Sequence, residues 1–171
     1  MTKAIFWDRD GVINEVTIVN NKALSPRKFI DFKLTQEISE HFQRTRELEF
    51  KNIIVTNQPD IARGLMAVEI LDEMHALLEK ELLVDEINLC PHDDLDQCSC
   101  RKPEPGLIIK SAEKNGIDLT KSYLLGDTRR DMLAGKAAGC KTILLQREYN
   151  NDAVELADYV ITNIREMFDF I

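Results

Sequence analysis

Short apolar segments that stop abruptly at polar residues recur along this chain of 171 residues and alternate with longer amphipathic segments. The first, Lys3–Trp7 (KAIFW), runs straight into Asp8-Arg9-Asp10-Gly11, and such a run predicts a buried strand. The other predicted strands are 52–56, 84–89, 123–125, 142–145 and 159–161. Strands that alternate with helices favour right-handed βαβ crossovers. We therefore expect an α/β fold with a mostly parallel sheet covered on both faces.

The amphipathic segments show the apolar spacing of helices. They lie at 35–49, 68–82, 105–114 and 130–138, followed by a short helix before the last strand and another at the C-terminus. Thr35 is expected to cap the first helix and Gly139 to end the fourth. No repeat or linker interrupts the pattern, and the segment after Asn14 is too short for a separate cap domain. Residues 1–171 are predicted to form a single domain.

Charge and hydropathy exclude several classes of protein. The chain has 22 Lys and Arg against 30 Asp and Glu, a formal charge of −8, which disfavours binding to a nucleic-acid backbone. It has no run near the ~20 apolar residues that cross a bilayer. Asp8, Arg9 and Asp10 come too early for the apolar core of a signal peptide. We expect a cytoplasmic protein with no membrane or nucleic-acid partner, and the lack of a heptad seam predicts a monomer.

Polar residues follow three of the predicted strands, at the edge where parallel sheets bind ligands. Asp8 and Asp10 follow the first strand, Thr56 and Asn57 the second, and Asp127 the strand at 123–125. An Asx turn would explain one of the first two carboxylates, whereas a pair is better explained by a cation. If their strands are neighbours, the three carboxylates form an oxygen site suited to Mg²⁺. Asp131, one helical turn further on, would support the metal shell or cap a helix end.

A second group of residues could bind an anion. Lys102, next to Arg101, offers an ammonium group, and Thr56 and Asn57 offer a hydroxyl and an amide. Each of these side chains, taken alone, is also typical of a solvated surface. Their order along the chain is what gives them meaning.

Three of the four cysteines lie within one short segment that also contains a histidine. Cys90, His92, Cys98 and Cys100 provide three thiolates and one imidazole, a closed tetrahedral Zn²⁺ set that leaves no position for water. We therefore expect structural zinc in a loop at about 90–100, the alternative being reduced thiols beside an incidental histidine. Cys140 is expected to be a core residue, and His41 and His75 are expected to be surface or packing residues on helices.

Taken in order, these motifs resemble the haloacid dehalogenase (HAD) superfamily of aspartate-based phosphatases. The resemblance is carried by Asp8-Arg9-Asp10-Gly11-Val12-Ile13-Asn14, by Thr56-Asn57-Gln58 with Ile61-Ala62-Arg63-Gly64, by Cys100-Arg101-Lys102-Pro103 with Pro105-Gly106, and by Gly126-Asp127 with Asp131-Met132. Together with the Cys/His loop they are similar to the superfamily's heptose bisphosphate and histidinol phosphate phosphatase branch. The resemblance covers nearly the whole chain and implies the HAD-like, Rossmannoid three-layer fold without a separate cap domain.

The resemblance also implies a role for each motif. Asp8 would be the nucleophile that forms an aspartyl-phosphate, and Asp10 the general acid and base. Mg²⁺ would be held by Asp8, the backbone carbonyl of Asp10 and Asp127. Thr56 and Asn57 would bind phosphoryl oxygens, and Lys102 would neutralise charge in the transition state. Asn14 lies in the segment that, with the zinc loop, sets specificity, and Arg101 would contact sugar groups or a second phosphate.

The substrate implied by the resemblance is D-glycero-D-manno-heptose 1,7-bisphosphate, which would lose its 7-phosphate in the synthesis of cell-surface polysaccharide precursors. The short zinc loop keeps histidinol phosphate as an alternative, with Asp60 or Asp93 as partner of its ammonium group. Pro59-Asp60 and Thr128 differ from the heptose branch, where Ser-Gly and Lys are common, so another sugar phosphate is a further alternative. A polynucleotide 3′-phosphatase and a non-catalytic zinc-stabilised interaction domain agree less well with the charge and the intact motifs.

Overall fold

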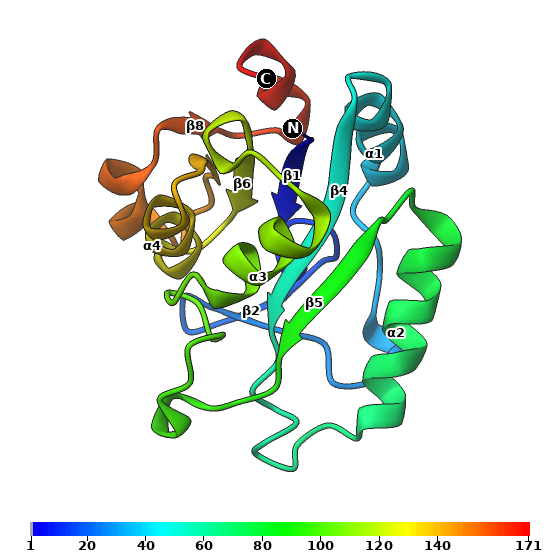
Figure 1. The fold of residues 1–171 in the computed structure, drawn as a ribbon. Coiled ribbons are helices and arrows are strands. Elements are labelled where there is room, and N and C mark those ends of the chain that lie inside the picture. The colour runs from blue at the N-terminus through cyan, green and yellow to red at the C-terminus, as the bar shows by residue number, and fades with distance from the viewer. Residues whose placement is uncertain (1) are drawn as a thin grey trace.

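Six parallel strands form one sheet in the computed structural model, which describes residues 2–171. The strands are ordered β5-β4-β1-β6-β7-β8, and each is parallel to its neighbours (Figure 1). Their bounds are β1 (Lys3–Trp7), β4 (Phe50–Asn57), β5 (Glu86–Cys90), β6 (Tyr123–Gly126), β7 (Lys141–Leu145) and β8 (Tyr159–Ile161). The expected mostly parallel sheet is confirmed.

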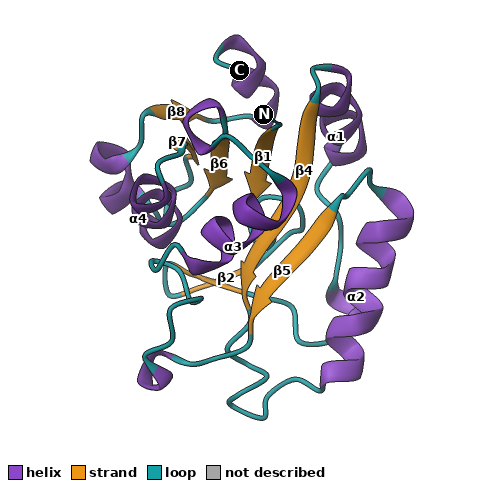
Figure 2. Ribbon diagram, viewed as in Figure 1, coloured by secondary structure: helices purple, strands orange, loops and turns teal. Residues whose placement is uncertain are grey.

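Helices cover both faces of this sheet (Figure 2). Two helices pack on the face that carries Ile5 and Trp7, and two on the face that carries Ala4 and Phe6. They are, respectively, α1 (Ile38–Glu47) with α2 (Val68–Glu81), and α3 (Gly106–Asn115) with α4 (Arg129–Ala138). Five short 3₁₀-helices within residues 2–171 lie between or after these elements: η1 (Phe29–Asp31), η2 (Asp94–Asp96), η3 (Leu119–Lys121), η4 (Asn151–Leu156) and η5 (Ile164–Asp169). The molecule is therefore a three-layer α/β structure.

The central position of β1 in the sheet explains why its sequence is apolar throughout and does not alternate with polar residues. Residues 4–7 are fully buried because successive side chains point into opposite layers, and both layers are covered. The Trp7 ring stacks on Phe42 of α1 with centroids 4.5 Å apart. Its indole Nε1 donates to Asn52 Oδ1 at 3.1 Å, which satisfies the one polar atom of the ring.

A small antiparallel hairpin, made of β2 (Thr17–Val19) and β3 (Lys22–Leu24), lies between β1 and α1. The sequence pattern did not predict it, because its strands are only three residues long and mostly exposed. The turn residues Asn20 and Asn21 have φ of 48° and 58°, the left-handed backbone of a tight hairpin turn, which asparagine tolerates. We call residues 16–27, which include this hairpin, the flap.

The ends and types of the helices agree only in part with the sequence prediction. Thr35 does not cap α1; its hydroxyl donates to the carbonyls of Val12 and Ile13, and the helix begins later, at Ile38. The last two predicted helices are 3₁₀-helices of six residues. Gly139 does end α4, with φ of 89°.

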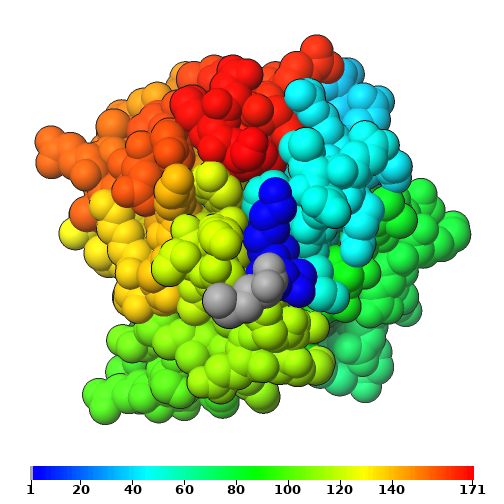
Figure 3. All heavy atoms as spheres, turned by 45° about the horizontal axis from the view of Figure 1, so that its top comes forward, coloured from blue at the N-terminus to red at the C-terminus, as the bar shows by residue number. Residues whose placement is uncertain are grey.

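The end of the molecule at the amino ends of the strands is shown in Figure 3. The C-terminal segment (red) packs there beside α1, where Arg44 lies over the ring of Phe168 and Arg165 pairs with Glu37. No helix in residues 2–171 is long and apolar enough to cross a membrane. The edge of the sheet at which ligands are expected to bind lies at the opposite end of the molecule, at the carboxyl ends of the strands.

Candidate active site

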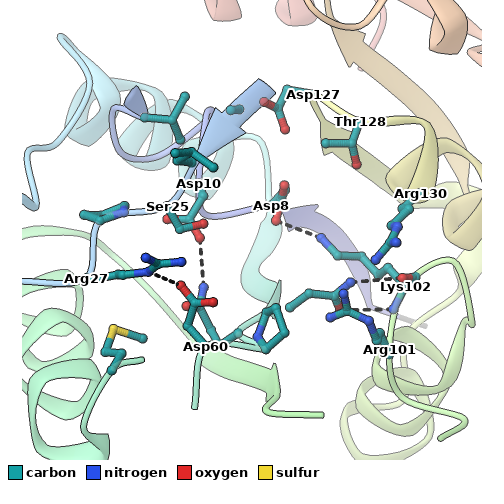
Figure 4. A pocket seen from close by; sticks show the side chains of 18 of the residues that line it. Asp8, Asp10, Ser25, Arg27, Asp60, Arg101, Lys102, Asp127, Thr128 and Arg130 are labelled. Carbon is teal, nitrogen blue, oxygen red and sulfur yellow. Dashed lines mark hydrogen bonds and ion pairs between the residues drawn. The ribbon is translucent and has the colours of Figure 1, made fainter. Parts of the chain in front are cut away.

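The carboxyl ends of three neighbouring strands bring the predicted carboxylates together. β1 lies between β4 and β6, with Trp7 beside Ile54 on one side and Leu125 on the other. The condition under which Asp8 and Asp127 could meet, that their strands be neighbours, is therefore met. They line a cavity of about 290 Å³ together with Asp10 and Lys102 (Figure 4). This volume is near the lower end for small-molecule sites, about 300–1,000 Å³.

Lys102 is the cation at the floor of this cavity. Its Nζ donates to Asp8 Oδ1 at 2.7 Å, to Asp131 Oδ1 at 2.5 Å and to the carbonyl of Val55 at 2.9 Å. Burial works against the charge, but the attraction of Asp131 and Asp8 is greater and raises the pKa of Lys102. The ammonium group therefore stays charged although the residue is only 3% exposed.

The acidic side of the cavity carries more negative charge than Lys102 balances. Burial, and then repulsion from Asp131, raise the pKa of Asp8 to about 7 against the lowering effect of Lys102. Burial and the charge of Asp8 also raise the pKa of Asp127. Oxygens of Asp8, Asp127 and Asp131 lie within 4.8 Å of one another. An additional cation is the simplest way to keep these carboxylates ionised together.

Asp127 has the free oxygen that such a cation would use. Its Oδ2 accepts from the Tyr149 hydroxyl, whereas its buried Oδ1 has no hydrogen-bond partner among the described residues. Both oxygens of Asp131 are taken, one by Lys102 and the other by Thr128 in the capping box of α4. The donor set therefore fits Mg²⁺, with Asp131 outside the inner shell.

Asp10 is held differently from the other carboxylates. The guanidinium of Arg9 donates to both of its oxygens at 2.9–3.2 Å, and the amides of Asn14 and Gln58 donate at 3.0 and 2.8 Å. Burial would raise the pKa of Asp10, but Arg9 and these hydrogen bonds together lower it. Arg9 itself is fully buried, and His75 on α2 lies 3.4 Å from its Nη1.

The predicted phosphate-binding residues occupy different depths. Asn57 lines the cavity, but its side chain is bonded to the backbone of Lys102, accepting from its N–H and donating to its carbonyl, both at 3.0 Å. Thr56 and Asn14 are buried behind the cavity and do not line it. The Thr56 hydroxyl accepts from Gln58, and Asn14 contacts Asp10.

The outer wall of the cavity is rich in arginine. Arg27 of the flap bonds Asp60 at 2.6 Å, and Arg63 bonds Asp93 at 2.5 Å and lies 3.5 Å from Asp60. The negative charge that Asp60 brings to the cavity is thus balanced by guanidinium groups. Arg101 lies on the opposite wall, where its Nη1 donates to the carbonyl of His92 (Figure 4).

The Cys/His cluster is assembled next to this wall. The sulfur atoms of Cys90, Cys98 and Cys100 lie 3.1–3.5 Å apart, and His92 Nδ1 is 3.4 Å from the Cys100 sulfur. All four ligand atoms lie within 4.8 Å of one another. Three sulfurs and one imidazole at such distances fit a closed tetrahedral zinc site. Cys140 is buried in the core, as predicted.

Several residues of the site were missed by the sequence analysis. Gln58 and Arg9 hold Asp10, Tyr149 holds Asp127, and Arg130 lines the cavity from α4. Tyr149 follows the predicted strand 142–145, so its place at the same edge of the sheet was a usable signal. Arg9 gave no such signal, since an arginine between two aspartates reads as a solvated charge.

Known proteins resemble the chain throughout its length. Residues 99–167 match the HAD-hydrolase-like family. The chain is 34% identical to a D-glycero-beta-D-manno-heptose-1,7-bisphosphate 7-phosphatase of Helicobacter pylori, with 99% of this chain and 97% of the relative covered. It is 32% identical to a D-glycero-alpha-D-manno-heptose-1,7-bisphosphate 7-phosphatase of Campylobacter jejuni, with 99% and 95% covered.

Solved structures show the same likeness. A D,D-heptose 1,7-bisphosphate phosphatase from B. bronchiseptica, complexed with magnesium and phosphate, superposes with a TM-score of 0.83 at 26% identity. The match covers 99% of this chain and all of that one. A D,D-heptose 1,7-bisphosphate phosphatase from Burkholderia thailandensis, at 24% identity and a TM-score of 0.67 over 99% of this chain and 98% of that one, shares the fold.

Proposed function

The chain belongs to the HAD-like phosphatase family that includes the heptose 1,7-bisphosphate 7-phosphatases, and from that premise we propose that it removes the 7-phosphate of D-glycero-D-manno-heptose 1,7-bisphosphate. The observation that carries the proposal is the meeting of Asp8, Lys102 and Asp127 in one cavity at the carboxyl edge of the sheet. A carboxylate, a buried cation and a carboxylate oxygen without a hydrogen-bond partner in this one cavity support the proposal.

Asp8 is the proposed nucleophile. Its carboxylate attacks phosphorus, the bond to the sugar oxygen breaks, and the phosphoryl group is carried as an aspartyl-phosphate until water releases it. Lys102, 2.7 Å from Asp8 Oδ1, is placed to offset the charge that gathers on the transferred oxygens. Asn57 holds the backbone of Lys102, so its contribution is to fix the position of that cation.

Asp10 is the proposed general acid and base. It lies two residues after the proposed nucleophile and also lines the cavity, which supports the assignment. In this role it would protonate the leaving sugar oxygen and later take a proton from the attacking water. Arg9, Asn14 and Gln58 orient its carboxylate. Because Asn14 and Thr56 do not line the cavity, we propose that they support the residues around Asp10 and do not contact the substrate directly.

Mg²⁺ is the proposed cofactor. Asp8, Asp127 and the backbone carbonyl of Asp10 would hold it, and when bound it would reduce the repulsion between the carboxylate of Asp8 and the phosphate anion. The free Oδ1 of Asp127 and the excess of buried carboxylates support this assignment. Zn²⁺ is proposed for the loop of Cys90, His92, Cys98 and Cys100, where it would fix the direction of Arg101.

A sugar bisphosphate suits the walls of the cavity better than the alternatives. Asp60 and Asp93, the two candidates for binding the ammonium group of histidinol phosphate, are both paired with arginines. A wall of guanidinium groups instead favours a substrate with a second anionic group. A cavity of about 290 Å³ also suits a small molecule and not a nucleic-acid strand.

Phosphate release in the presence of Mg²⁺ tests the proposal. The panel would contain both anomers of the heptose bisphosphate, histidinol phosphate, a 3′-phosphorylated oligonucleotide and p-nitrophenyl phosphate, with Asp8→Asn as the inactive control. A kcat/KM above ~10⁴ M⁻¹s⁻¹ for a heptose anomer, and far lower values for the other compounds, is the expected result. Preference for histidinol phosphate would overturn the substrate, and turnover that survives Asp8→Asn would overturn the mechanism.

A further inference from the structure

Two guanidinium groups from separate elements meet on one carboxylate beside the cavity. Arg101 follows the Cys/His loop, and its Nε donates to Asp94 Oδ1 at 2.8 Å. Arg130 lies in the first turn of α4, and its two terminal nitrogens lie 3.1 and 3.3 Å from the oxygens of Asp94. Asp94 therefore accounts for one negative charge between two positive ones.

Both arginines face the cavity, on the same wall as Lys102 (Figure 4). Asp94 does not line this cavity and lies behind them, in the Cys/His loop. The Arg101 side chain is only 9% exposed and is also held by the carbonyl of His92, so its direction is fixed. The side chains of Arg130 and Asp94 are 44% and 57% exposed, which leaves both free to change partner.

We propose that Arg130 is a specificity-determining residue that binds, together with Arg101, the phosphate group that the substrate keeps, and that Asp94 is the internal anion which this phosphate replaces. The assignment rests on the proposed function. A carboxylate held by two guanidinium groups marks a position where an oxyanion is stable, and a phosphate has more charge and more acceptor oxygens to offer there.

The exchange leaves no charge buried without a partner. Asp94 is more than half exposed, so its carboxylate can return to water when the phosphate takes over the guanidinium groups. Thr128, the residue after Asp127, brings no charge to this wall. The cation that this part of the cavity offers comes instead from Arg130, two residues later.

Steady-state kinetics of paired variants test the inference. In Arg130→Ala, we expect KM for the heptose 1,7-bisphosphate to rise about tenfold, equivalent to about 1.4 kcal/mol, with kcat within about twofold of the wild type. KM for p-nitrophenyl phosphate, which has no second phosphate, should not change. Arg129→Ala is the matched control, because that neighbouring guanidinium donates to the carbonyl of Asp152, away from the cavity.

Asp94→Asn provides the opposite test. Removing the internal anion should lower KM for the bisphosphate by about threefold or more, since the substrate no longer competes with a charge for the two arginines. Glu104→Gln is the control: it removes the same charge from the neighbouring surface. Glu104 forms no ion pair with an arginine among the described residues, so its loss should leave KM unchanged. Zinc content and melting temperature report whether the loop of Asp94 remains intact.

The outcomes separate the inference from the proposed function. If the wild type turns over the bisphosphate but Arg130→Ala changes KM for both substrates equally, or for neither, the assignment of Arg130 is wrong. A KM that rises in Asp94→Asn with zinc retained would overturn the role of Asp94 as a competing anion. If the wild type does not turn over any heptose bisphosphate while p-nitrophenyl phosphate is hydrolysed, the proposed substrate falls and this assignment with it.

Discussion

Lys102 donates to Asp8 Oδ1 at 2.7 Å although 94 residues separate the two along the chain. The contact joins the end of β1 to the segment after the Cys/His loop, so the cation depends on two distant parts of the fold. Replacing Lys102 by Met keeps the aliphatic stem and removes the charge. We expect kcat to fall about 10²- to 10³-fold, as on loss of a donor that stabilises a transition state.

The same change should also lower the melting temperature, because Asp8 and Asp131 would lose their shared buried counter-charge. Lys110→Met is a suitable control, since Lys110 is exposed on α3 and forms no ion pair within the described part of the chain. A Lys102→Met enzyme with full kcat would show that the ammonium group does not act on the transferred phosphate.

Gly11 lies against the carboxylate of Asp127 with φ of 86°, and a Cβ placed there would overlap that carboxylate. We expect Gly11→Ala to displace Asp127 and to raise several-fold the Mg²⁺ concentration needed for half-maximal activity. Gly64→Ala is the matched control: its φ is 66°, so it has the same left-handed backbone cost of about 1–2 kcal/mol, but no atom lies within 4 Å. Equal Mg²⁺ requirements in the two variants would contradict the placement of Asp127 at the metal.

The Cys/His loop should be a stability element. Cys98→Ser removes one of four ligands, and structural Zn²⁺ can contribute ~10 kcal/mol or more to folding. The expected result is a zinc content well below one per chain and a lower melting temperature, with a smaller effect on the kcat of the protein that remains folded. Cys140→Ser, outside the cluster, should retain its zinc. An unchanged melting temperature in Cys98→Ser would refute a structural role.

His75 should make stability depend on pH. Burial, and then the charge of Arg9, lower the pKa of His75 to about 4, against 6.5 for a free side chain. Between pH 6.5 and pH 4 the unfolded chain binds a proton at His75 that the folded chain does not. The free energy of unfolding is therefore unaffected by His75 above pH 6.5 and decreases as the pH falls toward 4. The effect is at most about 3 kcal/mol.

Chemical denaturation at several pH values isolates this contribution. The difference in unfolding free energy between pH 7 and pH 5 should be smaller in His75→Gln than in the wild type, since the variant has no group to titrate there. A pH dependence that is the same in both proteins would show that His75 is protonated as readily in the folded state as in the unfolded one.

The sequence predicted the parts of the site that lie directly after buried strands. Asp8, Asp10 and Asp127 follow from where apolar runs end, and the Cys/His loop follows from ligand chemistry and spacing. It did not predict which donors face the cavity. Thr56 and Asn57 are the last two residues of β4, yet only Asn57 lines the cavity, and its amide is bonded to the backbone of Lys102.

The remaining features depend on tertiary packing that no local pattern carries. The flap hairpin is too short and too exposed to show a period, and Thr35 bonds carbonyls of a loop more than twenty residues earlier instead of capping its own helix. Arg9 is buried because α2 and the ring of Phe32 cover it, which depends on the arrangement of distant segments.

The flap and the strands of the large sheet differ in how they are held. The carboxylates that would carry out the chemistry stand on central strands of the sheet, whereas the flap forms its own two-stranded ribbon and reaches the rest of the cavity through the pair of Arg27 and Asp60. The proposed chemistry and the flap side of the cavity wall thus lie in separable pieces of chain. A flap of another length or sequence could be grafted between the ends of residues 16–27 to retune which phosphate ester is accepted, while the catalytic floor is left untouched.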